Sequence, residues 1–134
     1  MKKLLLLVTL LMLPFSANCA ETYSFDANHT NITWHANHFG FSNPSGKFTD
    51  ATGIVVLDQQ SPNRSSVEIT IKTSSILTGI PKFDDYLKGQ NFFKTNRFPT
   101  AKFVSNKVFL KNRNIAKVHG DLTLLGVTKP VILD

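Results

Sequence analysis

Cysteine is nearly absent from this sequence. The 134 residues contain one cysteine, Cys19, which follows an N-terminal apolar segment. If that segment is removed together with Cys19, the remaining chain has no thiol, which excludes disulfides, thiol catalysis and thiolate metal sites. An exported domain of this size without disulfides must be held together by its hydrophobic core.

Common catalytic and nucleotide-binding motifs are missing as well. Residues 20–134 contain no GxSxG, HExxH or SxxK sequence and no Gly-rich phosphate loop. Asp84 and Asp85 are adjacent carboxylates, but helical neighbours point about 100° apart, and the helix dipole explains acidic residues in a first turn. The sequence therefore predicts a protein that is not an enzyme, with no catalytic residue and no cofactor.

Acidic residues are few, with 9 Asp and Glu against 15 Lys and Arg and a net charge of +6. The basic residues between Lys47 and Lys129 are scattered, without two in succession, which is typical of a solvated surface. We expect no nucleic-acid partner. The length suits one domain.

Long hydrophobic runs are limited to the N-terminus. Lys2 and Lys3 precede the apolar residues 4–13, which are followed by small and polar residues up to Ala20. This pattern predicts a secretory signal peptide over residues 1–20, cleaved near Cys19 or Ala20. Ten residues span only about 15 Å as a helix, too short for a permanent membrane anchor. A lipid anchor on Cys19 is the alternative, disfavoured by the preceding Asn18.

Alternation of apolar and polar residues dominates the rest of the chain. Val67, Ile69 and Ile71 alternate with polar residues, which predicts a half-buried strand. Further strands are expected at 22–26, 31–39, 47–58, 100–110, 115–125 and from 127 onward. Short turns rich in Asn, Pro, Ser and Gly, with the lone Gly126 in the last, favour antiparallel hairpins and an all-β fold.

One segment departs from this alternation. Pro81 is followed by Phe83, Tyr86 and Leu87, which share one face at helical spacing, and Gly89 ends the pattern. We expect a short helix at 82–88 that covers one end of a barrel or sandwich.

Phenylalanine is abundant, with 11 Phe against 2 Tyr and 1 Trp. In a barrel of about eight strands such rings can line a space for one small ligand. In a sandwich they would simply fill the core. Composition alone leaves both alternatives open.

The four histidines do not form a metal-binding pattern. His35 and His38 are separated by an odd number, so a regular strand would send them to opposite faces, whereas metal ligands converge. His29 lies in a turn-like segment, and His119 is distant. The sequence predicts no metal site and leaves backbone hydrogen bonding or ligand contact as roles for these residues.

Three stretches together resemble the YceI-like family of exported bacterial proteins. The first spans residues 23–53 and includes HFGFS at 38–42, the second includes DDYLK at 84–88 and FPTAKF at 98–103, and the third is HGDLTLLGVTKPV at 119–131. Several residues depart from the family pattern: Tyr86 stands where His is usual, Phe83 where many members have Arg, and Asn91 and Lys94 where acidic residues are common, and Thr30 replaces Ser.

The resemblance implies a periplasmic, antiparallel, lipocalin-like β-barrel over residues 21–134 that binds a polyisoprenoid or isoprenoid quinone. Members of the family continue beyond the third stretch with further strands. The resemblance therefore implies an incomplete barrel, with C-terminal strands missing and open edges that favour aggregation or a homodimer.

A long isoprenoid chain requires an apolar lining, because its affinity comes from buried hydrocarbon. The expected apolar lining consists of Trp34, Phe39, Phe83, Leu87, Phe92, Phe93 and Phe103. His29 and His38 are the expected polar contacts. Two alternatives stay open: a redox-accessory domain in which these histidines serve a bound quinone, and a structural sandwich without ligand.

Overall fold

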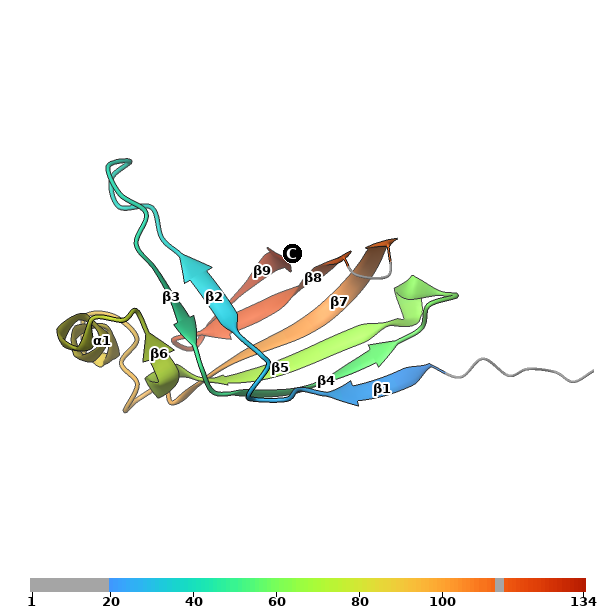
Figure 1. Cartoon of the computed structure of the whole chain (residues 1–134), viewed down its shortest axis with the longest axis horizontal. Coiled ribbons are helices and arrows are strands. Elements are labelled where there is room, and N and C mark those ends of the chain that lie inside the picture. Colours follow the sequence, from blue (N-terminus) through green and yellow to red (C-terminus); the bar gives the residue numbers. More distant parts are fainter. Residues whose placement is uncertain (1–19, 113–114) are drawn as a thin grey trace, which may run out of the picture.

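The structure is a computed structural model that describes residues 20–112 and 115–134, so nearly all of the expected signal peptide lies outside the described residues. Its described part consists of two antiparallel sheets, one short helix and two 3₁₀ turns (Figure 1). None of the described helices has the length and hydrophobicity needed to cross a bilayer.

The larger sheet has six strands in the order β1-β4-β5-β7-β8-β9. Their bounds are β1 (Glu21–Ser24), β4 (Ala51–Leu57), β5 (Ser66–Lys72), β7 (Thr100–Asn112), β8 (Ile115–Leu124) and β9 (Val127–Leu133). The smaller sheet consists of β2 (Ile32–His35), β3 (Ser45–Phe48) and β6 (Ile76–Leu77). The other elements are α1 (Pro81–Lys88) and the 3₁₀ turns Pro62–Arg64 and Thr73–Ser75.

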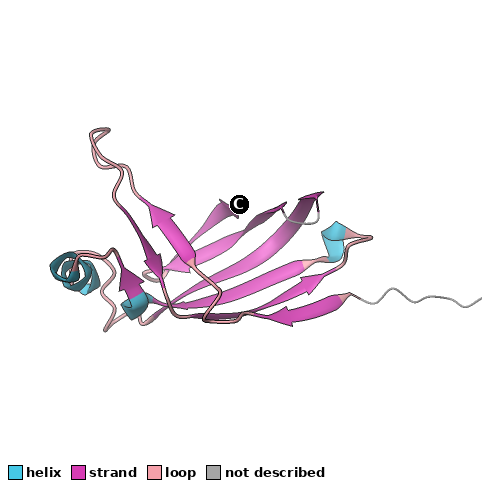
Figure 2. Ribbon diagram, viewed as in Figure 1, coloured by secondary structure: helices cyan, strands magenta, loops and turns pink. Residues whose placement is uncertain are grey.

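The all-β antiparallel prediction with one short helix is confirmed, and the barrel is not closed. Among the described residues, β9 pairs only with β8 and β2 only with β3. Figure 2 shows the β2–β3 hairpin rising away from the six-stranded sheet, with α1 near the base of the smaller sheet. The two sheets therefore form an open structure rather than a continuous cylinder.

The single strand expected at 47–58 is wrong, because the chain changes sheets within it. β3 ends at Phe48 and β4 begins at Ala51. Between them, the backbone N–H groups of Thr49 and Asp50 donate to the carbonyl and hydroxyl oxygens of Ser75, at 3.2 and 3.1 Å. This break allows Phe48 and Ala51, three residues apart, to be buried in the same core, which one regular strand would not permit.

Two further boundaries differ from expectation. β2 stops at His35 instead of continuing to residue 39: beyond it the pairing is reduced to an isolated bridge of His38 with Ser42, and the Asn37 side chain accepts a hydrogen bond from the Gly40 N–H in the turn that follows. The two-residue strand Ile76–Leu77 was not predicted, because so short a segment has no measurable period. It pairs with Lys47 and Phe48 and completes the smaller sheet.

Helix α1 begins at Pro81, one residue before the expected start, and ends at Lys88. Asp84 is buried, and its carboxylate accepts hydrogen bonds from the backbone N–H and the hydroxyl of Thr78, at 2.7 and 2.6 Å. This carboxylate therefore joins the helix to the segment before it, a role that the helix dipole alone did not predict. Asp85 is exposed and lies beyond the first turn, because the helix begins at Pro81 and only Asp84 is an acidic residue of that turn.

The β4–β5 connection depends on another buried carboxylate. Asp58 accepts hydrogen bonds from the backbone N–H groups of Ser61 and Gln60, at 2.8 and 3.1 Å, and from Arg64 Nε at 2.9 Å. These donors, Ser61 first, outweigh desolvation and lower the pKa of Asp58 below its ordinary value. The ionised form is thus favoured in the folded chain.

We expect this carboxylate to make the fold acid-sensitive. A lowered folded-state pKa means that Asp58 stabilises the fold above its unfolded pKa and loses that contribution as pH falls below about 4. In urea titrations at about pH 6 and about pH 3, the Asp58→Asn variant should be less stable than wild type at the higher pH and show a smaller acid loss. Asp26, whose pKa the side chain of His29 lowers, titrates in the same range and is unchanged in both proteins. Equal acid losses in the two proteins would contradict this assignment.

Candidate functional site

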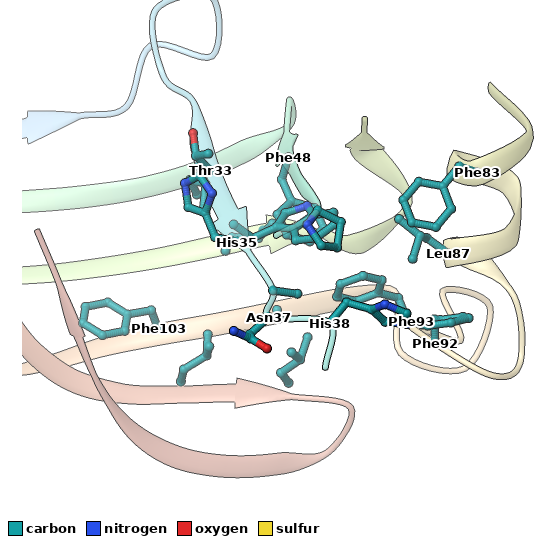
Figure 3. Close-up of a pocket in the computed structure, with 18 of the residues that line it drawn as sticks. Thr33, His35, Asn37, His38, Phe48, Phe83, Leu87, Phe92, Phe93 and Phe103 are labelled. Carbon is teal, nitrogen blue, oxygen red and sulfur yellow. The ribbon is translucent and has the colours of Figure 1, made fainter. Parts of the chain in front are cut away.

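A cavity of about 850 Å³ lies between the two sheets and α1 (Figure 3). This volume falls within the range of small-molecule sites. The apolar residues that line it are Ile32, Trp34, Phe48, Ile69, Ile71, Phe83, Tyr86, Leu87, Phe92, Phe93, Ala101, Phe103, Leu122, Leu124 and Leu133. Both sheets, the helix and the segment after the helix therefore contribute to one apolar wall.

The floor of the cavity is built by alternation along neighbouring strands. Ile69 of β5 is paired with Phe103 of β7, which is paired in turn with Leu122 of β8. Cross-strand partners point to the same face, so these side chains form a row across three strands. Ile71 and Ala101, also paired, form the next row. The small Ala101 side chain leaves space above the sheet.

The helix and the turn after it bring aromatic rings to one end of the cavity. Phe83 and Leu87 come from α1, and Phe93 is held beside it because its backbone N–H donates to the Leu87 carbonyl at 2.9 Å. The Phe93 ring meets Phe48 of the smaller sheet edge to face, with 5.6 Å between centroids. This contact connects the helical end to the sheet that covers the cavity.

Polar groups come mainly from β2 and the loop that follows it. Thr33, His35, Asn37, His38 and Ser42 all border the cavity. Both histidines reach it despite their odd separation, because β2 ends at His35 and the irregular residues Ala36 and Asn37 separate it from the bridge of His38 with Ser42. In the part of the chain that the structure describes, no three His, Cys, Asp or Glu side chains gather to hold a metal ion.

The structure brings most of the expected site residues together. Those that line the cavity are Trp34, Phe83, Leu87, Phe92, Phe93, Phe103 and His38. Phe39 does not line it: its side chain is 84% exposed at the tip of the β2–β3 hairpin. His29 does not line it either, since its Nδ1 lies 2.7 Å from an Asp26 carboxylate oxygen in an exposed turn.

Sequence reasoning missed the aliphatic part of the lining. Ile69 and Ile71 were placed on one face of a strand, but nothing local showed that this face borders a cavity. Leu122 and Leu124 share a face in the same manner. That face is set by strand register, which pairs Ile69 with Phe103 and Phe103 with Leu122. Strand register cannot be read from one sequence.

The fold and the cavity define a class of protein: an antiparallel β-sheet protein with one apolar, ligand-sized interior space. Residues 23–134 match the family model described as YceI-like domain, and the chain belongs to that family. It is 38% identical over its whole length to the UPF0312 protein plu2095 of Photorhabdus laumondii, covering 71% of that protein. It is 36% identical to Protein YceI of Shigella flexneri, covering 72%.

Solved structures show the same fold. BcnA of Burkholderia cenocepacia superposes with a TM-score of 0.69 at 23% identity, over 80% of this chain and 67% of that one. The YceI protein of Campylobacter jejuni gives a TM-score of 0.62 at 30% identity, over 84% of this chain and 66% of that one. The fold of most of this chain is therefore shared with proteins of known structure.

Proposed function

We propose that this protein is an exported, periplasmic binding protein without catalytic activity, which holds a polyisoprenoid or isoprenoid quinone in its cavity. The observation that carries the proposal is the cavity of about 850 Å³ with its apolar side chains from both sheets and α1. The signal-peptide pattern of residues 1–20 supports export. Membership of the YceI-like family supports the class of ligand.

The lining favours a hydrocarbon chain over a polar metabolite. Each buried CH₂ contributes about 0.8 kcal/mol. The affinity for a hydrocarbon chain therefore increases with the length of chain that the apolar wall covers. Polar side chains such as His38 and Asn37 lie on the β2 side. A ligand with one polar end would place that end there and its hydrocarbon over Phe103 and Leu122.

The site gives less support to each of the two alternatives. The redox alternative had His29 and His38 as its candidate groups, and of these His38 borders the cavity and His29 does not. The filled sandwich requires that the rings occupy the interior, whereas the described residues leave a ligand-sized space.

We expect the lipid to be recovered by organic extraction of the folded protein from the periplasmic fraction. Mass spectrometry should identify one stoichiometric isoprenoid in wild type and at least tenfold less in Leu122→Asp, because a carboxylate in the apolar wall opposes hydrocarbon binding. Val104→Asp is the matched control, since Val104 is 43% exposed and does not line the cavity.

Circular dichroism confirms that each variant is folded before extraction. Folded wild-type protein that yields no isoprenoid would overturn the proposal. Equal retention by Leu122→Asp and Val104→Asp would overturn the assignment of the cavity as the site.

A further inference from the structure

The tip of the β2–β3 hairpin exposes two aromatic side chains. Phe39 is 84% and Phe41 is 93% exposed, the largest values among the exposed large hydrophobic residues of the described chain. Figures 1 and 2 show this hairpin projecting from the rest of the molecule, with its tip far from the sheet. Isolated exposed side chains are common, but two rings at the end of a projecting loop form a compact apolar tip.

The turn at this tip places Phe39 where phenylalanine is unfavourable. Phe39 and Gly40 have φ values of 54° and 77°, and the Phe41 N–H donates to the His38 carbonyl at 3.1 Å. The loop Phe39–Phe41 is closed by the bridge between His38 and Ser42, and positive φ at its first two residues favours Asn and Gly over phenylalanine. In water, Asn at position 39 would satisfy the backbone better and expose no ring.

A second turn in the same chain provides an internal comparison. Leu125 and Gly126 connect β8 to β9 and have φ values of 53° and 74°. Leu125 is half-buried, so contact with the rest of the chain offsets its strained backbone. Phe39 has the same backbone conformation but remains almost fully exposed, although its ring contacts the neighbouring His38.

Apart from Lys47 in β3, the hairpin that presents these rings contains no Asp, Glu, Lys or Arg. Between Asp26 and Lys47 the sequence contains no Asp, Glu, Lys or Arg, although the chain as a whole has a net charge of +6. A segment without fixed charge enters a low-dielectric environment at little desolvation cost.

The tip also lies next to the polar side of the cavity. The His38 ring packs edge to face against Phe39, with 4.8 Å between centroids, and His38 borders the cavity together with Asn37 and Ser42. Whatever surface binds the two rings is therefore brought next to the polar side of the cavity.

We propose that the hairpin tip docks on a lipid bilayer, with Phe39 and Phe41 inserted into its interfacial region. Phenylalanine is one of the side chains that interfacial segments bury at the boundary between headgroups and acyl chains. Docking would place the polar side of the cavity near the membrane surface. The inference goes beyond ligand binding and holds whether or not the cavity contains lipid.

The test is sedimentation of the protein recovered from the periplasm with neutral phosphatidylcholine vesicles. We expect wild type to bind, and the double variant Phe39→Asn with Phe41→Ser to lose at least tenfold in partition coefficient, which corresponds to about 1.4 kcal/mol. Asn suits the turn at position 39, so the variant removes the rings while keeping the hairpin. The matched control, Phe109→Asn, removes a 42% exposed ring that does not line the cavity and should bind as wild type does.

Three results would overturn the proposal. The first is that wild type fails to bind neutral vesicles. The second is that the double variant binds them as well as wild type does. The third is that binding requires anionic lipid and disappears at about 0.5 M salt, where surface charges are screened. Sedimentation velocity without lipid tests whether a second copy of this chain binds the tip instead. If wild type is a dimer, the double variant is a monomer and neither binds vesicles, the tip is a dimer contact.

Discussion

Replacing Phe103 by alanine is expected to destabilise the fold by about 3–5 kcal/mol. Phe103 is 1% exposed, the most buried apolar side chain of the described core. It lies in the central strand pairing, between Ile69 of β5 and Leu122 of β8, and also borders the cavity. Because the total stability of a domain is about 5–15 kcal/mol, this loss would leave a marginal protein.

Urea unfolding followed by circular dichroism measures this effect. The neighbouring Val104→Ala is the control, because Val104 points to the opposite face and is 43% exposed. This change should lower the free energy of unfolding by about 0.5 kcal/mol or less, apart from a small effect of the lower strand propensity of alanine. If the two variants unfold at similar urea concentrations, the inward orientation of Phe103 is wrong.

Gly120→Ala is expected to destabilise the fold by about 3 kcal/mol, at the upper end of overpacking effects. A Cβ atom at Gly120 would lie 2.4 Å from the Val104 carbonyl oxygen and 2.5 Å from the Phe103 ring. The ring can rotate away, but the carbonyl belongs to the backbone of β7 and cannot move without disturbing the β7–β8 pairing. Urea unfolding of the single variant tests the magnitude.

A double-mutant cycle separates the two contacts. In a Phe103→Leu background the ring contact is gone and only the contact with the Val104 carbonyl remains, so Gly120→Ala should cost less than in wild type. An unchanged cost would show that the ring does not lie on Gly120. A smaller cost of Gly120→Ala in the Phe103→Leu background would support a cavity floor in which the glycine allows the Phe103 ring to lie close to the sheet.

This arrangement occurs twice in the six-stranded sheet. A Cβ atom at Gly53 of β4 would lie 2.4 Å from the Phe25 ring, as one at Gly120 would lie 2.5 Å from Phe103. Both glycines are part of the stretches that resemble the YceI-like family. Their structural reason is close approach of a ring to the backbone, which is distinct from the positive φ of Gly40 and Gly126.

The abundant phenylalanine side chains lie in several different environments. Phe103 and Phe48 are buried, Phe93 and Phe83 are partly buried around the cavity, and Phe39 is exposed at the hairpin tip. These side chains have the same chemistry, so their environments differ only because the chain places them differently. Counting rings predicted an apolar interior but not which rings form it.

The sequence by itself determined the elements whose signals are local. Alternation of Ile69 and Ile71 predicted β5, Pro81 and the spacing of Phe83 and Leu87 predicted α1, and Gly126 predicted the last hairpin turn. Each of these depends on neighbours within a few residues, because side-chain period and turn geometry are properties of the local backbone.

Only the tertiary structure decided how these elements combine. The break after Phe48, the pairing of β5 with β7 across the intervening helix, and the separation of Phe39 from the cavity depend on residues distant in sequence. Strand register and the choice of face follow from which strands meet, and a shift of one residue reverses every side chain. The lining of the cavity is therefore a property of the assembled sheets, whereas the family and the strands that build it are already visible in the sequence.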